Sequence, residues 1–264
     1  MENSFKELID YIGKQTSFRC QHYKEKPLKR RIKVRMRALN IHGFEEYHQY
    51  LKKEPEEMER LLDTITINLS YFFRNPETFE YLSNSIFPEF KKRTGPMVFW
   101  SAGCAHGEEP YSLAITAAEN SLLHRVDIYG TDIDNNVLQK ARAGVYTKLV
   151  FQYTPEEILK KYFTETEDGF AISDKIKRRV TFLNIDLFEP PSFDPCDLIV
   201  CRNVLIYLDR SAQSTILKNF YDHLKPGGYL VIGKAELLIG IPEVKLFEVI
   251  SRPEHVYRKK PVQS

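Results

Sequence analysis

The segment from Phe99 to Ile115 reads FWSAGCAHGEEPYSLAI and combines two glycines with two adjacent acids. Its apolar start predicts a strand, Gly103 and Gly107 predict a tight loop, and the residues from Glu108 onward predict a helix. Open α/β sheets bind nucleotide-like cofactors at such a unit. Two glycines separated by three residues are also common in ordinary turns. The neighbouring residues therefore have to show whether this loop binds a cofactor.

Glu108 and Glu109 open that helix and indicate the charge of a suitable cofactor. A diphosphate at the start of the helix would meet two carboxylates, which would repel it. S-adenosylmethionine has no phosphate and carries a sulfonium and an ammonium group, so the same carboxylates would attract it. The pattern therefore favours S-adenosylmethionine over a dinucleotide, although acids also suit the positive end of a helix without any ligand.

Further acids follow two later predicted strands. Asp132 ends the next strand after the glycine loop, where a carboxylate can accept hydrogen bonds from both hydroxyls of a ribose. Asp134 precedes the helical run Asn135–Ala143 and is predicted to cap it. Asp186 and Leu187 follow another strand and could lie beside an adenine ring, with a plain turn as an equal alternative.

Arg202 and Asn203 come directly after the apolar run Asp197–Cys201. This run is predicted to be a central strand, so the two polar residues would emerge at its carboxyl end. Ligands of doubly wound sheets bind in the crevice at that end. We therefore expect Arg202 and Asn203 to face the cofactor crevice.

Short apolar runs that alternate with helical segments are expected to position these residues. The runs cover residues 97–100, 126–130, 180–183, 197–201 and 229–233. Their alternation with helices predicts a doubly wound α/β sheet, here of the Rossmann-like type. Residues 147–179 break the rhythm and are predicted to form a small insertion of antiparallel strands, and Leu224–Gly228 predicts a tight turn between a helix and the last strand.

The first 65 residues are predicted to form a separate, all-helical unit. Apolar residues recur at helical spacing over Phe5–Ile12 and Leu28–Leu39, and two more helical stretches cover Phe44–Leu51 and Glu56–Thr64. We expect a helical docking domain over residues 1–65, a linker with a cofactor lid over 66–96, and a catalytic domain over 97–264.

Positive charge is concentrated in one segment of that helical unit. The formal net charge is +2, yet residues 24–37 hold eight basic residues and one acid. A basic face extending over the whole chain, which would favour nucleic-acid binding, is not indicated. If the segment is a helix with its apolar stripe inward, the side chains left toward solvent are Arg30, Arg31, Lys33, Arg35 and Arg37. We expect them to dock an acidic protein partner, with a plain solvated face as the alternative.

Composition and spacing also bear on the environment of the protein. No apolar run reaches the roughly 20 residues that a membrane span needs, and the N-terminus mixes charged with apolar residues, unlike a signal peptide. The four cysteines fit neither a metal nor a disulfide spacing and are predicted to be buried thiols. We therefore expect a cytoplasmic protein that uses no metal and does not insert into a membrane.

Five segments together resemble the CheR family of chemotaxis receptor methyltransferases. They are NLSYFFRNPETF (68–79), WSAGCAHGEEPYSLAI (100–115), GTDIDNNVLQKARAGVY (130–146), CRNVLIYLD (201–209) and LKPGGYLVIGKAE (224–236). The resemblance spans nearly the whole chain. It implies a class I methyltransferase domain behind a helical domain, with methyl transfer from S-adenosylmethionine to glutamate side chains of chemotaxis receptors and release of S-adenosylhomocysteine.

The resemblance also implies which residues contact the cofactor. Carried onto this sequence, they are Asn68, Ser70, Arg74, Glu108, Asp132, Asp186, Leu187, Arg202 and Asn203. Ser70 stands where many relatives have threonine and keeps the hydroxyl. In relatives that bind a receptor's carboxyl-terminal pentapeptide, the insertion carries a glycine-flanked loop extension. Because Thr164–Phe170 is short and acidic here, we expect no binding of such a pentapeptide.

A glutamate substrate determines what the catalytic residues have to do. Its carboxyl is already ionised at neutral pH, so no general base is needed, and the enzyme has to position the reactants and exclude water. We expect Arg74 and Tyr207 to hold the substrate carboxylate, and the resemblance points to the same two residues. A structural ion pair for Arg74 and packing against the cofactor for Tyr207 are the alternatives.

Two other functions would use the same cofactor crevice. One is a class I methyltransferase for a small molecule or RNA, which has no need of a cationic helical domain. The other is a non-catalytic, cofactor-sensing adaptor.

Overall fold

The computed structural model describes residues 2–16, 18–66 and 68–261. The chain divides into two compact units, Met1–Asn68 with Tyr207–Gln213, and Leu69–Ile206 with Ser214–Ser264. The first unit is helical, and the second is built on a mostly parallel sheet. Among the described residues, no helix has both the length and the apolar character that crossing a membrane requires.

Amphipathic helices form the first unit. They are α1 (Glu2–Gln15), α2 (Glu25–Ala38), α3 (Phe44–Lys53) and α4 (Glu56–Thr66), with the 3-10 turn η1 (Cys20–His22) between the first two. Their apolar faces meet in one core that includes Leu8, Ile12, Ile32, Tyr47 and Leu61. The helices predicted from apolar spacing are therefore confirmed.

One basic residue of α2 does not behave as predicted. We expected Arg35 to face solvent, but its Nε and Nη2 donate to Oε1 and Oε2 of Glu57 in α4, at 2.8 and 2.7 Å. Tyr47 Oη donates to the same Oε1 at 3.0 Å. The Glu57 side chain is 1% exposed, and a carboxylate buried so deeply requires a cationic partner. Arg35 therefore joins α2 to α4 instead of forming part of a docking face.

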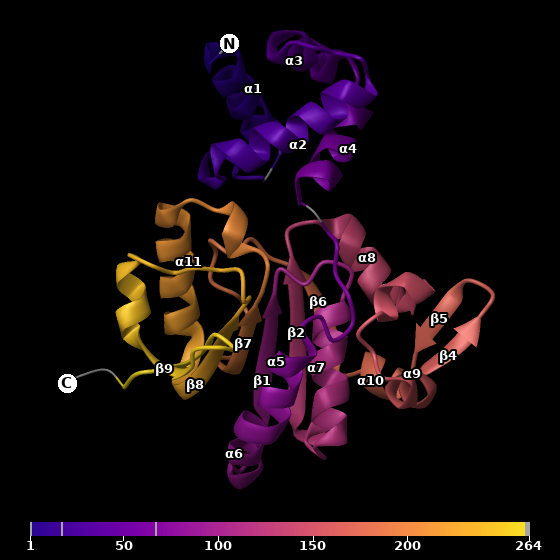
Figure 1. The fold of residues 1–264 in the computed structure, drawn as a ribbon, viewed down its shortest axis with the longest axis vertical. Coiled ribbons are helices and arrows are strands. Elements are labelled where there is room, and N and C mark those ends of the chain that lie inside the picture. The colour runs from indigo at the N-terminus through magenta and orange to yellow at the C-terminus, as the bar shows by residue number, and fades with distance from the viewer. Residues whose placement is uncertain (1, 17, 67, 262–264) are drawn as a thin grey trace. The chain divides into compact units, whose positions relative to one another are not determined.

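The second unit contains a seven-stranded sheet in the described residues, ordered β6-β2-β1-β7-β8-β10-β9 (Figure 1). The strands are β1 (Met97–Ala102), β2 (Val126–Asp132), β6 (Val180–Asn184), β7 (Cys196–Cys201), β8 (Leu224–Ile232), β9 (Phe247–Ser251) and β10 (Val256–Lys259). The first five in spatial order are parallel, and β10 runs antiparallel to both its neighbours. The chain builds outward from β1 to β6 and then returns to place β7 on the other side of β1. The predicted doubly wound sheet is confirmed, and its order reverses between β1 and β7.

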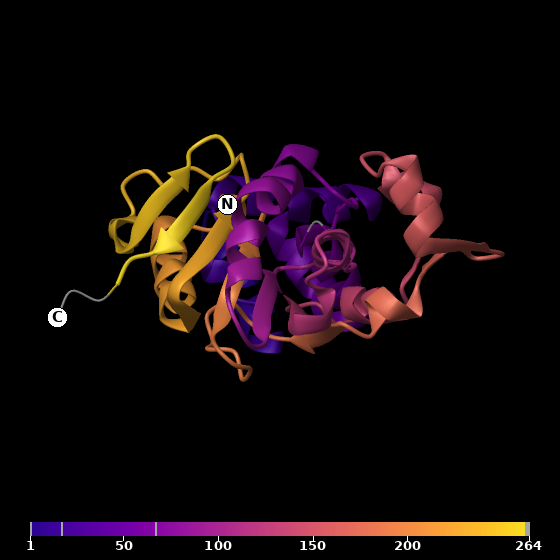
Figure 2. The ribbon, with the colours of Figure 1, turned by 90° about the horizontal axis from the view of Figure 1, so that it is seen from below.

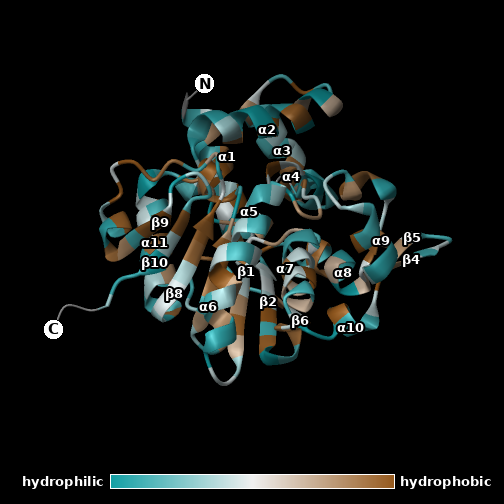
Figure 3. Cartoon of the chain, turned by 60° about the horizontal axis from the view of Figure 1, so that its bottom comes forward, coloured by the Kyte–Doolittle hydropathy of each residue, from teal (hydrophilic) through white to brown (hydrophobic). Residues whose placement is uncertain are grey.

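Helices cover both faces of this sheet. They include α5 (Pro76–Tyr81), the π-helical turn η2 (Leu82–Ile86), α6 (Phe87–Lys92), α7 (Glu108–Glu119), α8 (Asn135–Ala143) and α11 (Arg210–His223). Neighbouring residues of a strand point to opposite faces. Phe99 of β1 packs on Phe90 of α6 with ring centroids 5.4 Å apart, and Trp100 packs on Phe220 of α11 at 5.2 Å. Figure 3 shows the apolar strands between helices with polar outer surfaces.

The predicted insertion of antiparallel strands is also present. It contains β3 (Val145–Tyr146), η4 (Lys148–Phe151), α9 (Glu156–Tyr162), β4 (Phe163–Thr166), β5 (Gly169–Ile172) and α10 (Asp174–Lys177). β5 pairs antiparallel with β3 and β4, and Thr166 lies opposite Gly169 across a two-residue turn. Figures 1 and 2 show β4 and β5 projecting from the sheet beyond its β6 edge.

The turn predicted over Leu224–Gly228 is wrong, because β8 already begins at Leu224. Gly227 has φ +69°, and the pairing of β8 with β7 shifts register after Cys196. Between the pairs Cys196–Leu224 and Leu198–Tyr229, β8 has four residues and β7 has one, so β8 bends irregularly there, and Gly227 supplies the positive φ of this bend. Glycines that indicate a turn in the sequence therefore serve a bend within a strand.

Candidate functional site

The glycine loop between β1 and α7 is held close to its neighbours at the carboxyl end of the sheet. Gly103 has φ +76°, and a Cβ there would lie 2.4 Å from Val204 Cγ2 in the loop that follows β7. The N–H groups of Gly103 and Cys104 both donate to Thr131 O of β2, at 2.8 and 2.9 Å. A glycine is therefore required where the backbone of this loop passes between the ends of β2 and β7.

Asp132 lies beside this loop, as the sequence predicted for a ribose ligand. Its Oδ2 accepts the N–H of Ala105 at 2.9 Å, and its Oδ1 accepts the N–H of Asp134 at 3.1 Å. Burial raises the pKa of Asp132 to about 6, against the effect of these bonds. Each carboxylate oxygen keeps a lone pair for a further donor such as a ribose hydroxyl. Asp134 caps α8 as predicted, since its Oδ1 accepts the N–H of Asn136 at 2.8 Å.

The loop after β6 is joined to the loop after β2. Asn184 Nδ2 donates to the carbonyls of Asp132 and Ile133, at 3.1 and 2.7 Å. Asp186 Oδ1 accepts the N–H of Phe188 at 3.0 Å, and Leu187 O accepts from Asn219 at 3.1 Å. The Asp186 side chain thus stabilises a turn, which was the alternative to a contact with adenine. Asp186 and Leu187 both lie in a loop that is fixed beside Asp132.

Glu108 is the first residue of α7 and is 2% exposed. Burial raises the pKa of this carboxyl to about 7, and a hydrogen bond from Ser70 opposes the rise. Glu108 Oε2 has no hydrogen-bond partner within the described part of the chain. A buried carboxylate with a bare oxygen is costly unless a cationic or donor group occupies the site.

The negative charge of Glu109 is balanced by side chains of the protein itself. It accepts from Ser101 Oγ at 2.8 Å and pairs with Nη1 of Arg202 at 3.4 Å. Nη2 of Arg202 donates to the carbonyl of Arg74 and to Oδ1 of Asn75, at 2.5 and 2.6 Å. Arg202 therefore anchors the segment before α5 to the ends of β1 and β7. Its guanidinium is largely occupied by these bonds, and Arg74 is left half-buried beside it.

Glu236 is a buried residue of this edge that the sequence reasoning missed. Its Oε1 accepts the N–H groups of Val204 and Leu205 at 2.9 and 2.7 Å, and its Oε2 accepts that of Gly233. Burial raises its pKa to about 7. The bonds fix the loop after β7, in which Asn203 adopts φ +64°. Its position could have indicated this role, because Glu236 is an acid shortly after a predicted strand and ends the segment 224–236 that resembles the CheR family.

The charges at this edge fit S-adenosylmethionine. Glu109 is paired with an arginine, and Asp132 and Glu236 accept backbone N–H groups. Glu108 keeps a buried oxygen without a partner among the described residues, where a sulfonium or ammonium group would neutralise it. Of the residues that the structure describes, no group of three or more His, Cys, Asp or Glu side chains is placed to hold a metal ion.

The four cysteines are buried and form no disulfide, as predicted.

Two of the predicted site residues belong to the helical unit. Asn68 ends the first segment of that unit, and Tyr207 is grouped with it through residues 207–213. Within it, Tyr207 O accepts the N–H of Lys24 at 2.8 Å, and Tyr23 forms an isolated bridge with Leu208. The roles of Asn68 and Tyr207 stay predictions.

Comparison with known proteins gives the family. Residues 68–255 match the model for the CheR methyltransferase SAM binding domain, and residues 3–66 match that for the CheR methyltransferase all-alpha domain. A chemotaxis protein methyltransferase of Borreliella burgdorferi is 30% identical over 88% of this chain and 87% of its own length. Chemotaxis protein methyltransferase 2 of Vibrio cholerae is 30% identical over 92% and 88%, and a chemotaxis protein methyltransferase of Listeria innocua is 34% identical over 82% and 83%.

These matches agree with the side chains that the structure brings together at the carboxyl end of the sheet, among them Glu108, Asp132 and Arg202. S-adenosylmethionine is the cofactor that both the domain match and the charges at Glu108 indicate. The chain, an S-adenosylmethionine-dependent methyltransferase, belongs to the CheR family.

Proposed function

We propose that this chain methylates glutamate side chains in the cytoplasmic part of chemotaxis receptors, for sensory adaptation. The observation that carries the proposal is the combination of two matched CheR domains with a half-buried arginine, Arg74, beside the cofactor crevice. An arginine there supplies charge-assisted hydrogen bonds to a carboxylate substrate. A neutral small-molecule substrate would gain nothing from it.

The cofactor contacts proposed for this site follow from the positions of the side chains at the carboxyl end of the sheet. Glu108 would neutralise a positive group of the cofactor, and Asp132 would accept from its ribose. Ser70 would hold the Glu108 carboxyl in place, and Asp186 with Leu187 would border the adenine. Arg202 would act chiefly by anchoring the segment before α5, and Asn203 would act from the loop that Glu236 fixes. Asn68 stays a predicted cofactor contact.

The reaction needs little chemistry from the protein. When bound, S-adenosylmethionine supplies a methyl group whose bond to sulfur breaks as a carboxylate oxygen attacks, leaving an ester and a neutral thioether. Arg74 and Tyr207 would hold that carboxylate so that one oxygen points at the methyl carbon. No proton has to move, because a glutamate is ionised at neutral pH. The contribution of the protein is therefore alignment and exclusion of water.

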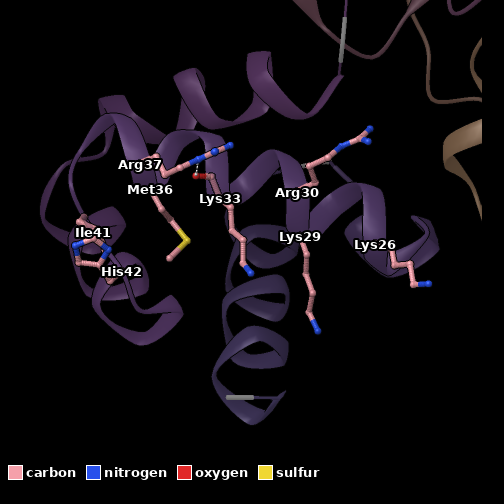
Figure 4. Close-up of a pocket in the computed structure, with 8 residues that line it drawn as sticks. All are labelled: Lys26, Lys29, Arg30, Lys33, Met36, Arg37, Ile41 and His42. Carbon is pink, nitrogen blue, oxygen red and sulfur yellow. Dashed lines mark hydrogen bonds between the residues drawn. The ribbon is translucent and has the colours of Figure 1, made fainter.

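The basic face of α2 would dock the receptor. Lys26, Lys29, Arg30, Lys33, Met36, Arg37, Ile41 and His42 line a cavity of about 530 Å³ (Figure 4). Figure 4 shows Lys29 and Lys33 extending along one side of the helix. Arg30, Lys33 and Arg37 are exposed, and Arg31 is half-buried. A receptor helix that offers several glutamates is acidic, so this surface would attract it over a distance set by the ionic strength.

Charge reversal tests this docking role. Arg30→Glu with Arg37→Glu is expected to raise the KM for a receptor fragment and weaken its salt dependence, with cofactor affinity unchanged. Arg60→Glu, at an exposed arginine of α4, is the matched control. Equal KM values and equal salt responses in all three proteins would show that the face is merely solvated.

The short β4–β5 hairpin supports the expectation that no receptor pentapeptide is bound. Its turn contains Glu167 and Asp168 alone, so no loop extension is present between the paired ends of the strands. Equal methylation of receptor fragments with and without a carboxyl-terminal pentapeptide would agree with this proposal.

Methyl transfer to a receptor fragment is the decisive experiment. The protein is incubated with methyl-labelled S-adenosylmethionine and a purified receptor cytoplasmic fragment, and the fragment is then treated with mild base. An ester releases the label as methanol, whereas an N-methyl group does not. Replacement of the fragment's candidate glutamates by alanine should abolish the label. Tight cofactor binding without any transfer would instead indicate a sensing adaptor.

A further inference from the structure

An exposed apolar surface follows β8 in the second unit. Leu237 and Ile239 are 69% and 73% exposed, which is unusual for two large aliphatic side chains so close together. They border a cavity of about 580 Å³ that Val249 of the edge strand β9 also lines. We call Leu237, Ile239 and Val249 the apolar rim.

The loop that carries the apolar rim is held in a defined conformation. Leu238 and Ile241 alternate with the exposed residues and are buried, at 9% and 5% exposed. The N–H of Ile241 donates to Leu238 O at 3.3 Å. Because the buried residues anchor the loop, the exposed ones are displayed at fixed positions and cannot turn inward to be covered by the protein's own core.

The apolar rim begins next to a loop of the proposed cofactor site. Gly233 follows β8, and a Cβ on it would lie 3.0 Å from the N atom of Asn203. Glu236 accepts N–H groups from both of these loops and immediately precedes Leu237. The backbone leading into Leu237 is therefore fixed beside the loop that contains Asn203.

Basic side chains border the apolar part. Lys245 and Arg252 line the same cavity, and both are exposed. Of the residues lining it, Glu236 carries the one carboxylate, and that group is buried in bonds to backbone N–H groups. A partner that fits must offer apolar side chains next to negative charge.

We propose that the apolar rim and its basic border are a second docking site, for the amphipathic acidic helix that carries the glutamate to be methylated. This rests on the proposed function. A helix that presents a glutamate to the crevice presents residues three and four positions away on the same face, about one turn or 5.4 Å along its axis. Apolar residues there would cover Leu237 and Ile239, and flanking acids would meet Lys245 and Arg252. The rim selects which glutamates of the receptor are methylated.

The test removes the apolar contact without touching the crevice. In Leu237→Ser/Ile239→Ser, kcat/KM for a receptor cytoplasmic fragment should fall about tenfold through KM, as expected for two lost apolar contacts. The Kd for S-adenosylmethionine and the thermal midpoint should stay unchanged. Leu149→Ser, at a residue 81% exposed on η4, is the matched control and should keep wild-type kinetics. Arg252→Glu should lower kcat/KM in a salt-dependent way.

Three results would overturn the proposal. Unaltered kcat/KM in the double variant would show that the apolar rim touches no substrate, and a parallel loss of cofactor affinity would show a role in building the crevice. A wild-type dimer that becomes monomeric in the variant, measured by sedimentation velocity, would show that a second copy covers the surface. If the wild type transfers no base-labile methyl, the proposed function fails, and calorimetric binding of the fragment to wild type and variant then tests the surface separately.

Discussion

The bare carboxylate of Glu108 makes a quantitative prediction about cofactor binding. Its pKa of about 7 in the free protein is set by burial, and a bound cation would lower it. S-adenosylmethionine should therefore bind the ionised form and release a proton near neutral pH. With a pKa of about 7, about nine-tenths of the carboxyl is ionised at pH 8 and about one-tenth at pH 6. Affinity should consequently rise about tenfold from pH 6 to pH 8.

Glu108→Gln removes the charge and keeps the shape of the side chain. At pH 8 it should weaken cofactor binding by about 1.5 to 3 kcal/mol, the range of a hydrogen bond to a charged group. The tenfold rise should disappear in the variant above pH 6. A rise of about twofold from pH 6 to pH 8 should remain in the variant, because burial also raises the pKa of Asp132 to about 6, and in wild type this rise adds to the one due to Glu108. Glu119→Gln, at the other end of α7, is the matched control.

Isothermal titration calorimetry provides both readouts. The Kd is measured at pH 6, 7 and 8, and the proton release at pH 7 comes from the enthalpies in phosphate and in Tris buffer. S-adenosylhomocysteine lacks the sulfonium, so a reduced pH dependence with this ligand would place the sulfonium near Glu108. If wild type and Glu108→Gln bind the cofactor with the same Kd at all three pH values, Glu108 is not the group that receives the positive charge.

Three further predictions address other residues. Asp132→Ala should weaken cofactor binding by about 1 to 3 kcal/mol, because ribose hydroxyls lose their acceptor, and calorimetry on the folded variant measures this directly. Arg74→Ala should lower kcat for receptor methylation far more than it changes the cofactor Kd, and similar losses in both would place Arg74 on the cofactor instead. Glu57→Ala should destabilise the helical unit by about 3 kcal/mol, since Arg35 and Tyr47 lose their buried partner, and urea unfolding should show no such change for Arg30→Ala.

Local patterns in the sequence were sufficient for most of the elements. Helical spacing located α1 to α4, and the order of apolar runs gave the parallel strands of a doubly wound sheet. The capping role of Asp134 was also predicted, because a cap depends on residues two or three positions away. The bend at Gly227 within β8 was missed, since glycine occurs in turns and in irregular parts of strands alike, and the pairing with β7 decides between them.

The sequence indicated where the candidate site residues lie, but not how the charges among them are balanced. Residue type and strand ends pointed to Glu108, Asp132 and Arg202, because the carboxyl ends of parallel strands meet at one edge. Charge and position at the start of the helix did not separate Glu108 from Glu109, and only the family resemblance singled out Glu108. The fold pairs Glu109 with Arg202, far away in the chain, and leaves an oxygen of Glu108 bare.

The same limit explains Arg35 and Glu236. Amphipathic spacing determined which face of α2 turns inward, yet the pairing of Arg35 with Glu57 depends on how α4 packs against that helix. Glu236 gained its role from two loops that the sheet brings together. The sequence by itself determined the elements, the cofactor class and the family, because these depend on residue type and short-range spacing. Which charges are compensated and which are left for a ligand was decided by the tertiary structure, because compensation requires contacts between residues distant in the chain.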